Sequence, residues 1–265
     1  MIIHNFDPVL VDLGLFQIRW YSIAYIIGIV AGWIYALKII KFTSKDKYNF
    51  EPIKNYQFDN LITYLVIGII FGGRLGYVLL YNFEYYIQNL LEILKIWQGG
   101  MSFHGGLLGV IASTIIFSKK TKTNFFKFTD IISCVAPIGI FFGRLANFIN
   151  AELYGKISIL PWSVVFPGAG NIARHPSQIY EAILEGALLF ILMNYLALKK
   201  NLLFQTGYIS GIFLILYSVF RMISEIFREP DQHLGYFFTY ISLGSILSLI
   251  TLIIGLLIIL SIKKK

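Results

Sequence analysis

The sequence contains little charge and almost no cysteine. Only 14% of its 265 residues are charged, whereas 57% are apolar, and the mean hydropathy is +0.72. These values lie outside the usual range of soluble domains and predict a membrane protein. The single cysteine, Cys134, excludes an intramolecular disulfide, and its apolar neighbours favour a small buried side chain over a reactive nucleophile.

Signatures of several membrane enzymes are also missing. The string nearest to the Gly-x-Ser-Gly of an intramembrane serine protease is GYISG at Gly207–Gly211. No spaced aspartate cluster could hold the magnesium of a CDP-alcohol phosphotransferase, and no phosphate-cradling P-loop is present. The sequence therefore implies no metal and no cofactor.

Seven apolar stretches are long enough to cross a bilayer, because a span needs roughly 20 mostly apolar residues. They cover residues 21–40, 61–80, 101–118, 131–148, 179–198, 208–227 and 241–262. We therefore expect an all-α, polytopic membrane protein with seven transmembrane helices, organised as one catalytic domain over residues 1–265.

Lysines follow every second predicted span and also end the chain. The clusters are Lys38, Lys41, Lys45, Lys47 and Lys54, then Lys119, Lys120, Lys122 and Lys127, then Lys199 and Lys200, and finally Lys263, Lys264 and Lys265. The net charge of +8 therefore reflects membrane topology, and we expect no nucleic-acid partner. The positive-inside rule places the N-terminus outside and the C-terminus in the cytoplasm.

Two connections between the predicted spans are long enough to carry structure of their own. In 81–100, apolar residues recur at helical spacing from Tyr85 to Trp97 with polar residues between them, which predicts a helical arm lying in the outer interface. In 149–178, proline and glycine recur, so we expect an irregular loop that caps the outer mouth.

Ionisable side chains are costly in hydrocarbon, so their depth is informative. The predicted outer halves of the spans hold Tyr21, Arg74, His104, Arg144, Glu181, Glu185 and Arg221. Arginines in a polar chamber suit an anionic phosphate, because a guanidinium binds two phosphate oxygens and stays charged. Histidine titrates nearest neutrality, so His104 is a candidate general base. The alternative is a set of buried ion pairs that only hold the helices together.

Four strings carry a resemblance to a known family. They are HGGLLGV (His104–Val110), GRLANFINAELYG (Gly143–Gly155), RHPSQIYE (Arg174–Glu181) and FRMISEIFREPD (Phe220–Asp231). Together they resemble the prolipoprotein diacylglyceryl transferases, and further similar strings extend the likeness over nearly the whole chain. Two departures are Ala151, where the family signature has glycine, and a short Val165–Arg174 segment.

The resemblance implies the first step of bacterial lipoprotein maturation. The diacylglyceryl group of phosphatidylglycerol moves to the lipobox cysteine of a preprolipoprotein, which forms a thioether and releases glycerol phosphate. The expected location is the bacterial cytoplasmic (inner) membrane, with the active site toward the outer leaflet and the lipid bilayer around the spans.

The resemblance also implies the site residues. The catalytic set is Tyr21, His104, Arg144, Asn147, Glu152 and Arg221, and the substrate-binding set is Arg74, Arg144, Gly155, His175, Tyr217, Arg221 and Glu225. We expect Arg144 and Arg221 to hold the phosphate, and His104 or a nearby carboxylate to act as base. Glutamates at 152 and 225 would orient the arginines or bind glycerol hydroxyls.

A lipid or anion transporter is the main alternative function, because a polar chamber could pass a substrate without changing it. A transporter site should lie near the midplane and connect to both sides of the membrane. The predicted inner halves of the spans carry almost no ionisable residues, which disfavours such a pathway. The buried arginines disfavour a seven-span receptor in the same way.

Overall fold

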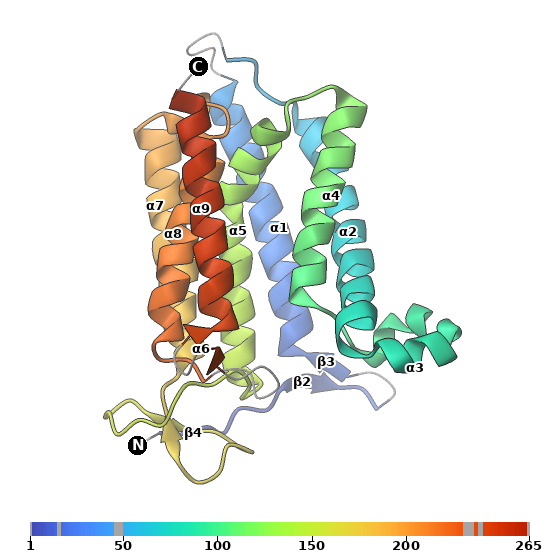
Figure 1. Cartoon of the computed structure of the whole chain (residues 1–265), viewed down its shortest axis with the longest axis vertical. Helices are drawn as coiled ribbons and strands as arrows, with labels where there is room; N and C mark the ends of the chain where they lie inside the picture. Colours follow the sequence, from blue (N-terminus) through green and yellow to red (C-terminus); the bar gives the residue numbers. More distant parts are fainter. Residues whose placement is uncertain (1, 15–16, 45–49, 230–235, 238–240, 264–265) are drawn as a thin grey trace. The chain divides into compact units, whose positions relative to one another are not determined.

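Helices make up most of the chain, as its apolar stretches predict (Figure 1). The computed structural model describes residues 2–14, 17–44, 50–229, 236–237 and 241–263. Two units are distinguished and are described one at a time. Unit 1 comprises Met1–Thr43 and Asp130–Lys265, and unit 2 comprises Ser44–Thr129.

Unit 1 holds most of the long helices. They are α1 (Trp20–Thr43), α5 (Phe125–Ile149) apart from its residues 125–129, the helical run Ser177–Lys199, α8 (Tyr208–Glu225) and α9 (Leu243–Lys263). The run consists of α6 (Ser177–Glu181), the π-helical stretch Ala182–Leu188, α7 (Leu189–Asn194) and a second π-helical stretch, Tyr195–Lys199, and the 3-10 turn Leu202–Phe204 follows it. A Cβ on Gly255 of α9 would lie only 2.8 Å from the carbonyl oxygen of Gly211 on α8, so these two backbones touch.

Unit 2 is built on a close pair of helices, α2 (Asn55–Tyr81) and α4 (Phe103–Thr121). A Cβ on Gly76 would lie 2.7 Å from the Cα of Gly105, and a Cβ on Gly72 would lie 2.9 Å from the Cα of Gly109. Glycine at these positions therefore permits the close approach of the two helices, which is a common use of small residues in membranes.

Six helices of the described residues are long and apolar enough to cross a membrane. They are Trp20–Thr43, Asn55–Tyr81, Phe125–Ile149, Ser177–Lys199, Tyr208–Glu225 and Leu243–Ile262, and each overlaps one predicted span. The third predicted span, 101–118, corresponds to α4, which has 19 residues but is less apolar. The membrane class is confirmed, whereas seven spans and their orientation stay predictions. Lys45, Lys47, Lys264 and Lys265, used to predict that orientation, and Pro230 and Asp231 of the fourth string lie outside the described residues.

Short strands join the helices at several places. Their bounds are β1 (Ile2–Ile3), β2 (Val9–Asp12), β3 (Gln17–Arg19), β4 (Val164–Val165), β5 (Ala173–Arg174), β6 (Tyr236–Phe237) and β7 (Ile241–Ser242). β2 pairs with β3 and β6 with β7, while β4 lies between β1, in parallel, and β5, in antiparallel register. The expectation of an irregular 149–178 connection is therefore wrong at β4 and β5, because the β-branched Val164 and Val165 of β4 pair with β1 of the N-terminal segment and with β5.

The connection 81–100 is helical, but it is not the continuous helix that its spacing predicts. It contains α3 (Phe83–Gln88) and two 3-10 helices, Leu90–Leu94 and Ile96–Gln98. The carbonyls of Glu92 and Lys95 accept hydrogen bonds from the guanidinium of Arg74 at 2.6 Å and 3.3 Å, and Glu92 O also accepts the amide of Lys95 at 3.2 Å in the 3-10 helix. Leu91 is 78% exposed and Trp97 is 76% exposed, as an interfacial arm requires, although its place at the membrane stays a prediction.

Candidate functional site

Two arginines from different helices share one pair of buried carboxylates in unit 1. Arg144 of α5 lies 2.7 Å from Glu181 Oε2 through Nη1 and 3.3 Å from Glu185 Oε2 through Nη2. Arg221 of α8 lies 3.3 Å from the same Glu181 oxygen and 3.5 Å from Glu185 Oε1. Positions four apart lie on one side of a helix, so the helical run Ser177–Lys199 presents both carboxylates together.

The cluster continues along α8 and past its end. Arg221 forms a second ion pair with Glu225, one turn later on the same helix. Glu225 in turn accepts a hydrogen bond of 2.8 Å from the hydroxyl of Ser242, which precedes α9. Arg228 lies 3.3 Å from Glu181 Oε1. Three guanidinium groups therefore face three carboxylates, and the formal charges balance.

The arginines and their glutamates differ in accessibility. The side chains of Glu181 and Glu185 are 0% exposed, whereas those of Arg144 and Arg221 are 17% and 12% exposed. The two arginine side chains therefore keep some accessible surface, whereas the two carboxylates keep none. The carboxylates hold the guanidinium groups in place at this edge of the cluster.

A hydrogen-bonded group links α1 to the end of α5. The side-chain amide of Asn147 donates to the hydroxyl of Tyr21 at 2.7 Å and to Oε1 of Glu152 at 2.7 Å. Asn147 is buried and lies three residues after Arg144, on the same side of α5. The structure therefore brings Tyr21 of α1 and Glu152 together at Asn147, on the helix that also carries Arg144.

The segment after Glu152 packs against the residues around His175. A Cβ on Gly155 would lie 2.7 Å from Cβ of His175, so a larger residue would push this contact apart. The amide of Gly155 donates to the carbonyl of His175 at 2.9 Å, and the His175 Nδ1 lies 3.2 Å from the hydroxyl of Tyr180. Burial, together with the charge of Lys156, lowers the pKa of His175 from its ordinary value.

The remaining predicted site residues lie on α8 and in unit 2. Tyr217 lies on α8, one turn before Arg221. His104 is the second residue of α4, whose first turn is capped by the hydroxyl of Ser102. Arg74 lies on α2 and is buried. His104 and Arg74 both belong to unit 2.

Comparison with known sequences decides the family. The family description "Prolipoprotein diacylglyceryl transferase" matches residues 8–261. This chain belongs to the prolipoprotein diacylglyceryl transferase family. Proteins named phosphatidylglycerol–prolipoprotein diacylglyceryl transferase from Rickettsia bellii and Rickettsia typhi are each 48% identical to it, over 95% and 96% of the chain and 94% and 96% of their own lengths. The protein of that name from Rickettsia canadensis is 49% identical over 96% of both chains.

The structure adds residues that the sequence did not assign to the transferase site. Glu181 and Glu185 lie in the predicted outer halves of the spans but have no role among the expected site residues, and Arg228 is not among those residues. Gln178, which is fully buried, donates to the carbonyl of Glu152 at 2.6 Å. The RHPSQIYE string contains Gln178 and Glu181, and the FRMISEIFREPD string contains Arg228, but neither string nor the spacing tells which distant arginine each carboxylate will meet.

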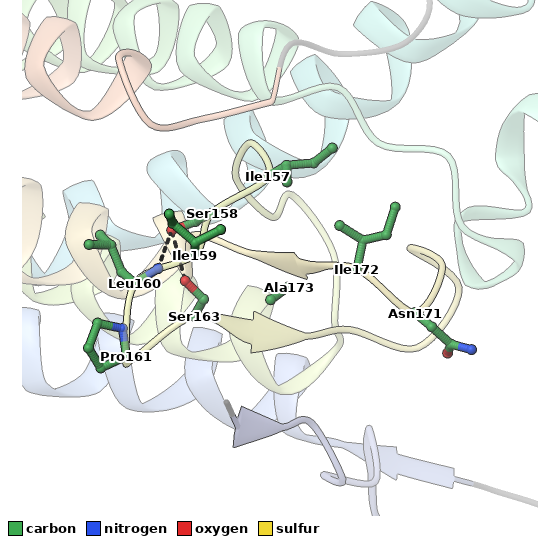
Figure 2. A pocket seen from close by; sticks show the side chains of 9 residues that line it. All are labelled: Ile157, Ser158, Ile159, Leu160, Pro161, Ser163, Asn171, Ile172 and Ala173. Atoms are coloured by element: carbon green, nitrogen blue, oxygen red, sulfur yellow. Dashed lines mark hydrogen bonds between the residues drawn. The ribbon is translucent and has the colours of Figure 1, made fainter.

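A shallow groove of about 430 Å³ lies in the 149–178 connection of the transferase. Figure 2 shows Ser158, Ile159, Leu160, Pro161 and Ser163 on one side and Asn171 and Ile172 on the other, with Ile157 and Ala173 between them. Its lining is mostly apolar, and it contains no ionisable side chain and no predicted site residue. The groove is therefore separate from the charged cluster and offers no group for transfer chemistry.

Proposed function

We propose that this chain transfers the diacylglyceryl group of phosphatidylglycerol to the lipobox cysteine thiol of preprolipoproteins. The products are a thioether-linked lipid and glycerol phosphate. Family membership supports the reaction class, and the relatives' names supply its two substrates. The lipobox and the thioether come from the family resemblance.

One structural observation supports the proposal most directly. Arg144 and Arg221 converge on Glu181 and Glu185 while keeping accessible surface of their own. Buried carboxylates without partners would be strongly destabilising, so the arginines are held in place before any lipid binds. Such an edge suits a phosphodiester, because preorganised donors stabilise charge without reorganisation during the reaction.

The proposed reaction is a displacement at the glycerol carbon of the lipid. The thiol loses its proton to a base, the sulfur–carbon bond forms, and the bond from that carbon to the phosphate oxygen breaks. Arg144 and Arg221 would take the negative charge that the leaving phosphate gains. His104 or a nearby carboxylate would take the proton, because the thiolate is the nucleophile. Asn147 would hold Tyr21 and Glu152 beside the arginines.

We further propose that the chain is one catalytic domain in the bacterial inner membrane, with seven spans and the active site toward the outer leaflet. This predicts that Lys122 faces the cytoplasm and Trp162 faces outward. In a Cys134→Ala background, an impermeant thiol reagent should label Trp162→Cys but not Lys122→Cys in intact cells. Labelling at position 122 would overturn this orientation.

The function is tested by product release from purified protein in detergent or lipid. Phosphatidylglycerol and a lipobox peptide should yield glycerol phosphate, and a peptide with serine in place of the lipobox cysteine should yield none. A reaction with phosphatidylethanolamine at the same concentration is the control for the choice of lipid headgroup. Glycerol phosphate release that does not depend on the cysteine would indicate hydrolysis and would contradict transfer.

A further inference from the structure

Arg74 directs its whole guanidinium group at the backbone of one connection. Nε donates to Ile93 O at 2.8 Å, Nη1 to Gly99 O at 2.6 Å and Gly100 O at 3.2 Å, and Nη2 to Glu92 O at 2.6 Å and Lys95 O at 3.3 Å. A guanidinium group has five N–H donors, so each one is engaged. No donor of Arg74 is left for a phosphate oxygen.

The surroundings of Arg74 fit this use. Its side chain is buried, with 4% exposed, and the ring of Tyr86 stands 5.1 Å from the guanidinium carbon. A Cβ on Gly100 would lie 2.9 Å from Nη1 and 2.6 Å from the ring of Tyr77, so glycine leaves the space that the carbonyl contacts need. The site is shaped around backbone oxygens of residues 92–100.

The same connection leads directly into the first turn of α4. The amide of Ser102 donates to the carbonyl of Gly73, the neighbour of Arg74, at 2.8 Å. The hydroxyl of Ser102 then accepts from the amide of Gly105 at 3.3 Å and caps α4, whose second residue is His104. Positions 73 and 74 of α2 therefore fix both the middle and the end of the connection.

We propose that Arg74 is a positioning residue that sets the 92–102 connection and, through it, the first turn of α4 with His104. This role differs from the substrate contact that the family resemblance suggests for Arg74. It rests on the proposed function where it concerns His104, whereas the ordering of the connection stands independently of any reaction.

The test combines Arg74→Lys and Arg74→Gln with two readouts. Lysine has three N–H donors on one nitrogen, so it cannot reach carbonyls from 92 to 100 at once. In both variants, hydrogen exchange of residues 90–102 should rise by about tenfold or more, with exchange of α5 and α8 unchanged. The kcat should fall by about tenfold or more, with KM for phosphatidylglycerol nearly constant, because a misplaced catalytic group lowers turnover.

Two further variants keep the test decisive. Lys95→Gln removes a cation and an ion pair of 2.6 Å with Glu92 in the same connection, yet leaves the carbonyl contacts, and should change neither readout. Gly100→Ala disturbs the contacts between Arg74 and the carbonyls of residues 92–100 without changing the charge of Arg74. It replaces the Arg74 variants in the test if those variants do not fold.

Three results would overturn the proposal. These are unchanged exchange in the Arg74 variants, raised exchange with normal kcat, or a raised KM that lysine restores. If the native protein has no transferase activity, the proposed function fails. The hydrogen-exchange measurement still tests whether Arg74 orders the 92–102 connection.

Discussion

The phosphate role of Arg144 can be separated from a purely structural role by changing it to lysine. Arg144 contacts Glu181 and Glu185 through different nitrogens, 2.7 Å and 3.3 Å from their oxygens. A lysine keeps the positive charge but loses the planar fork that can hold these carboxylates and present N–H groups to phosphate at once. Glu185 keeps Arg221 as a second partner at 3.5 Å, so the variant should still fold.

The expected losses differ in size. Losing one electrostatic contact to a developing anion costs about 3–4 kcal/mol, or roughly a hundred- to a thousand-fold in turnover. Weakening one hydrogen bond to a charged group costs about 1.5–3 kcal/mol of folding free energy, which leaves most of a stable membrane protein folded. The assay is kcat for diacylglyceryl transfer, measured with the folded fraction and melting temperature of the same preparation. Arg221→Lys should behave in the same way.

Arg174→Lys is a matched control, because Arg174 is 16% exposed and also pairs with a glutamate, Glu229, at 3.2 Å. Its activity should stay within about threefold of native, because its partner Glu229 is 44% exposed and the pair lies outside the cluster of Glu181 and Glu185. Near-normal turnover in Arg144→Lys and Arg221→Lys would refute the phosphate role. So would a loss of turnover that only follows the loss of folded protein, because the arginines would then serve stability alone.

Three further changes test other parts of the account. Cys134→Ala should leave transfer intact, because Cys134 is fully buried and the reacting thiol belongs to the substrate, and loss of turnover in folded protein would revive a covalent mechanism. Ala151 has φ of 54°, so Ala151→Gly should raise the free energy of unfolding by about 0.5–1 kcal/mol, and an unchanged or lower melting temperature would contradict this reason. The lowered pKa of His175 means that the unfolded chain binds a proton more readily near pH 6, so stability should fall as pH drops below about 6.5. His175→Gln should make that pH slope shallower in thermal melts, and equal slopes would show that His175 does not contribute.

The helices could be predicted because hydropathy is a local property of the sequence. Each of the six long apolar helices overlaps a predicted span. Arg144 and Asn147 could be placed on one side of a helix by their spacing of three. The resemblance also marked Ala151 as a position where the family has glycine, but it did not predict the conformation there. The φ of 54° shows that Ala151, just past the end of α5, adopts the left-handed conformation that glycine adopts more easily.

The features that could not be predicted depend on contacts between distant segments. Ile2 pairs with Val164, and no local pattern in either segment names the other as its partner. The helical character of 81–100 was correct, but the break into α3 and two 3-10 helices, whose carbonyls also bind the distant Arg74, was not predicted. Glu181 and Glu185 could be seen as a pair, whereas their arginine partners lie 36 or more residues away in the sequence. Contacts between residues far apart in the sequence therefore determine the features that hydropathy and spacing do not predict.

The most direct test of the account is the mass of the acceptor after reaction. Purified protein, phosphatidylglycerol and a lipobox peptide should give a peptide that is heavier by one diacylglyceryl group, in equal amount to the glycerol phosphate released. The adduct should resist neutral hydroxylamine, which cleaves a thioester but neither a thioether nor the oxygen esters of the diacylglyceryl group. A peptide of unchanged mass, or one that carries only a single hydroxylamine-sensitive acyl chain, would contradict diacylglyceryl transfer.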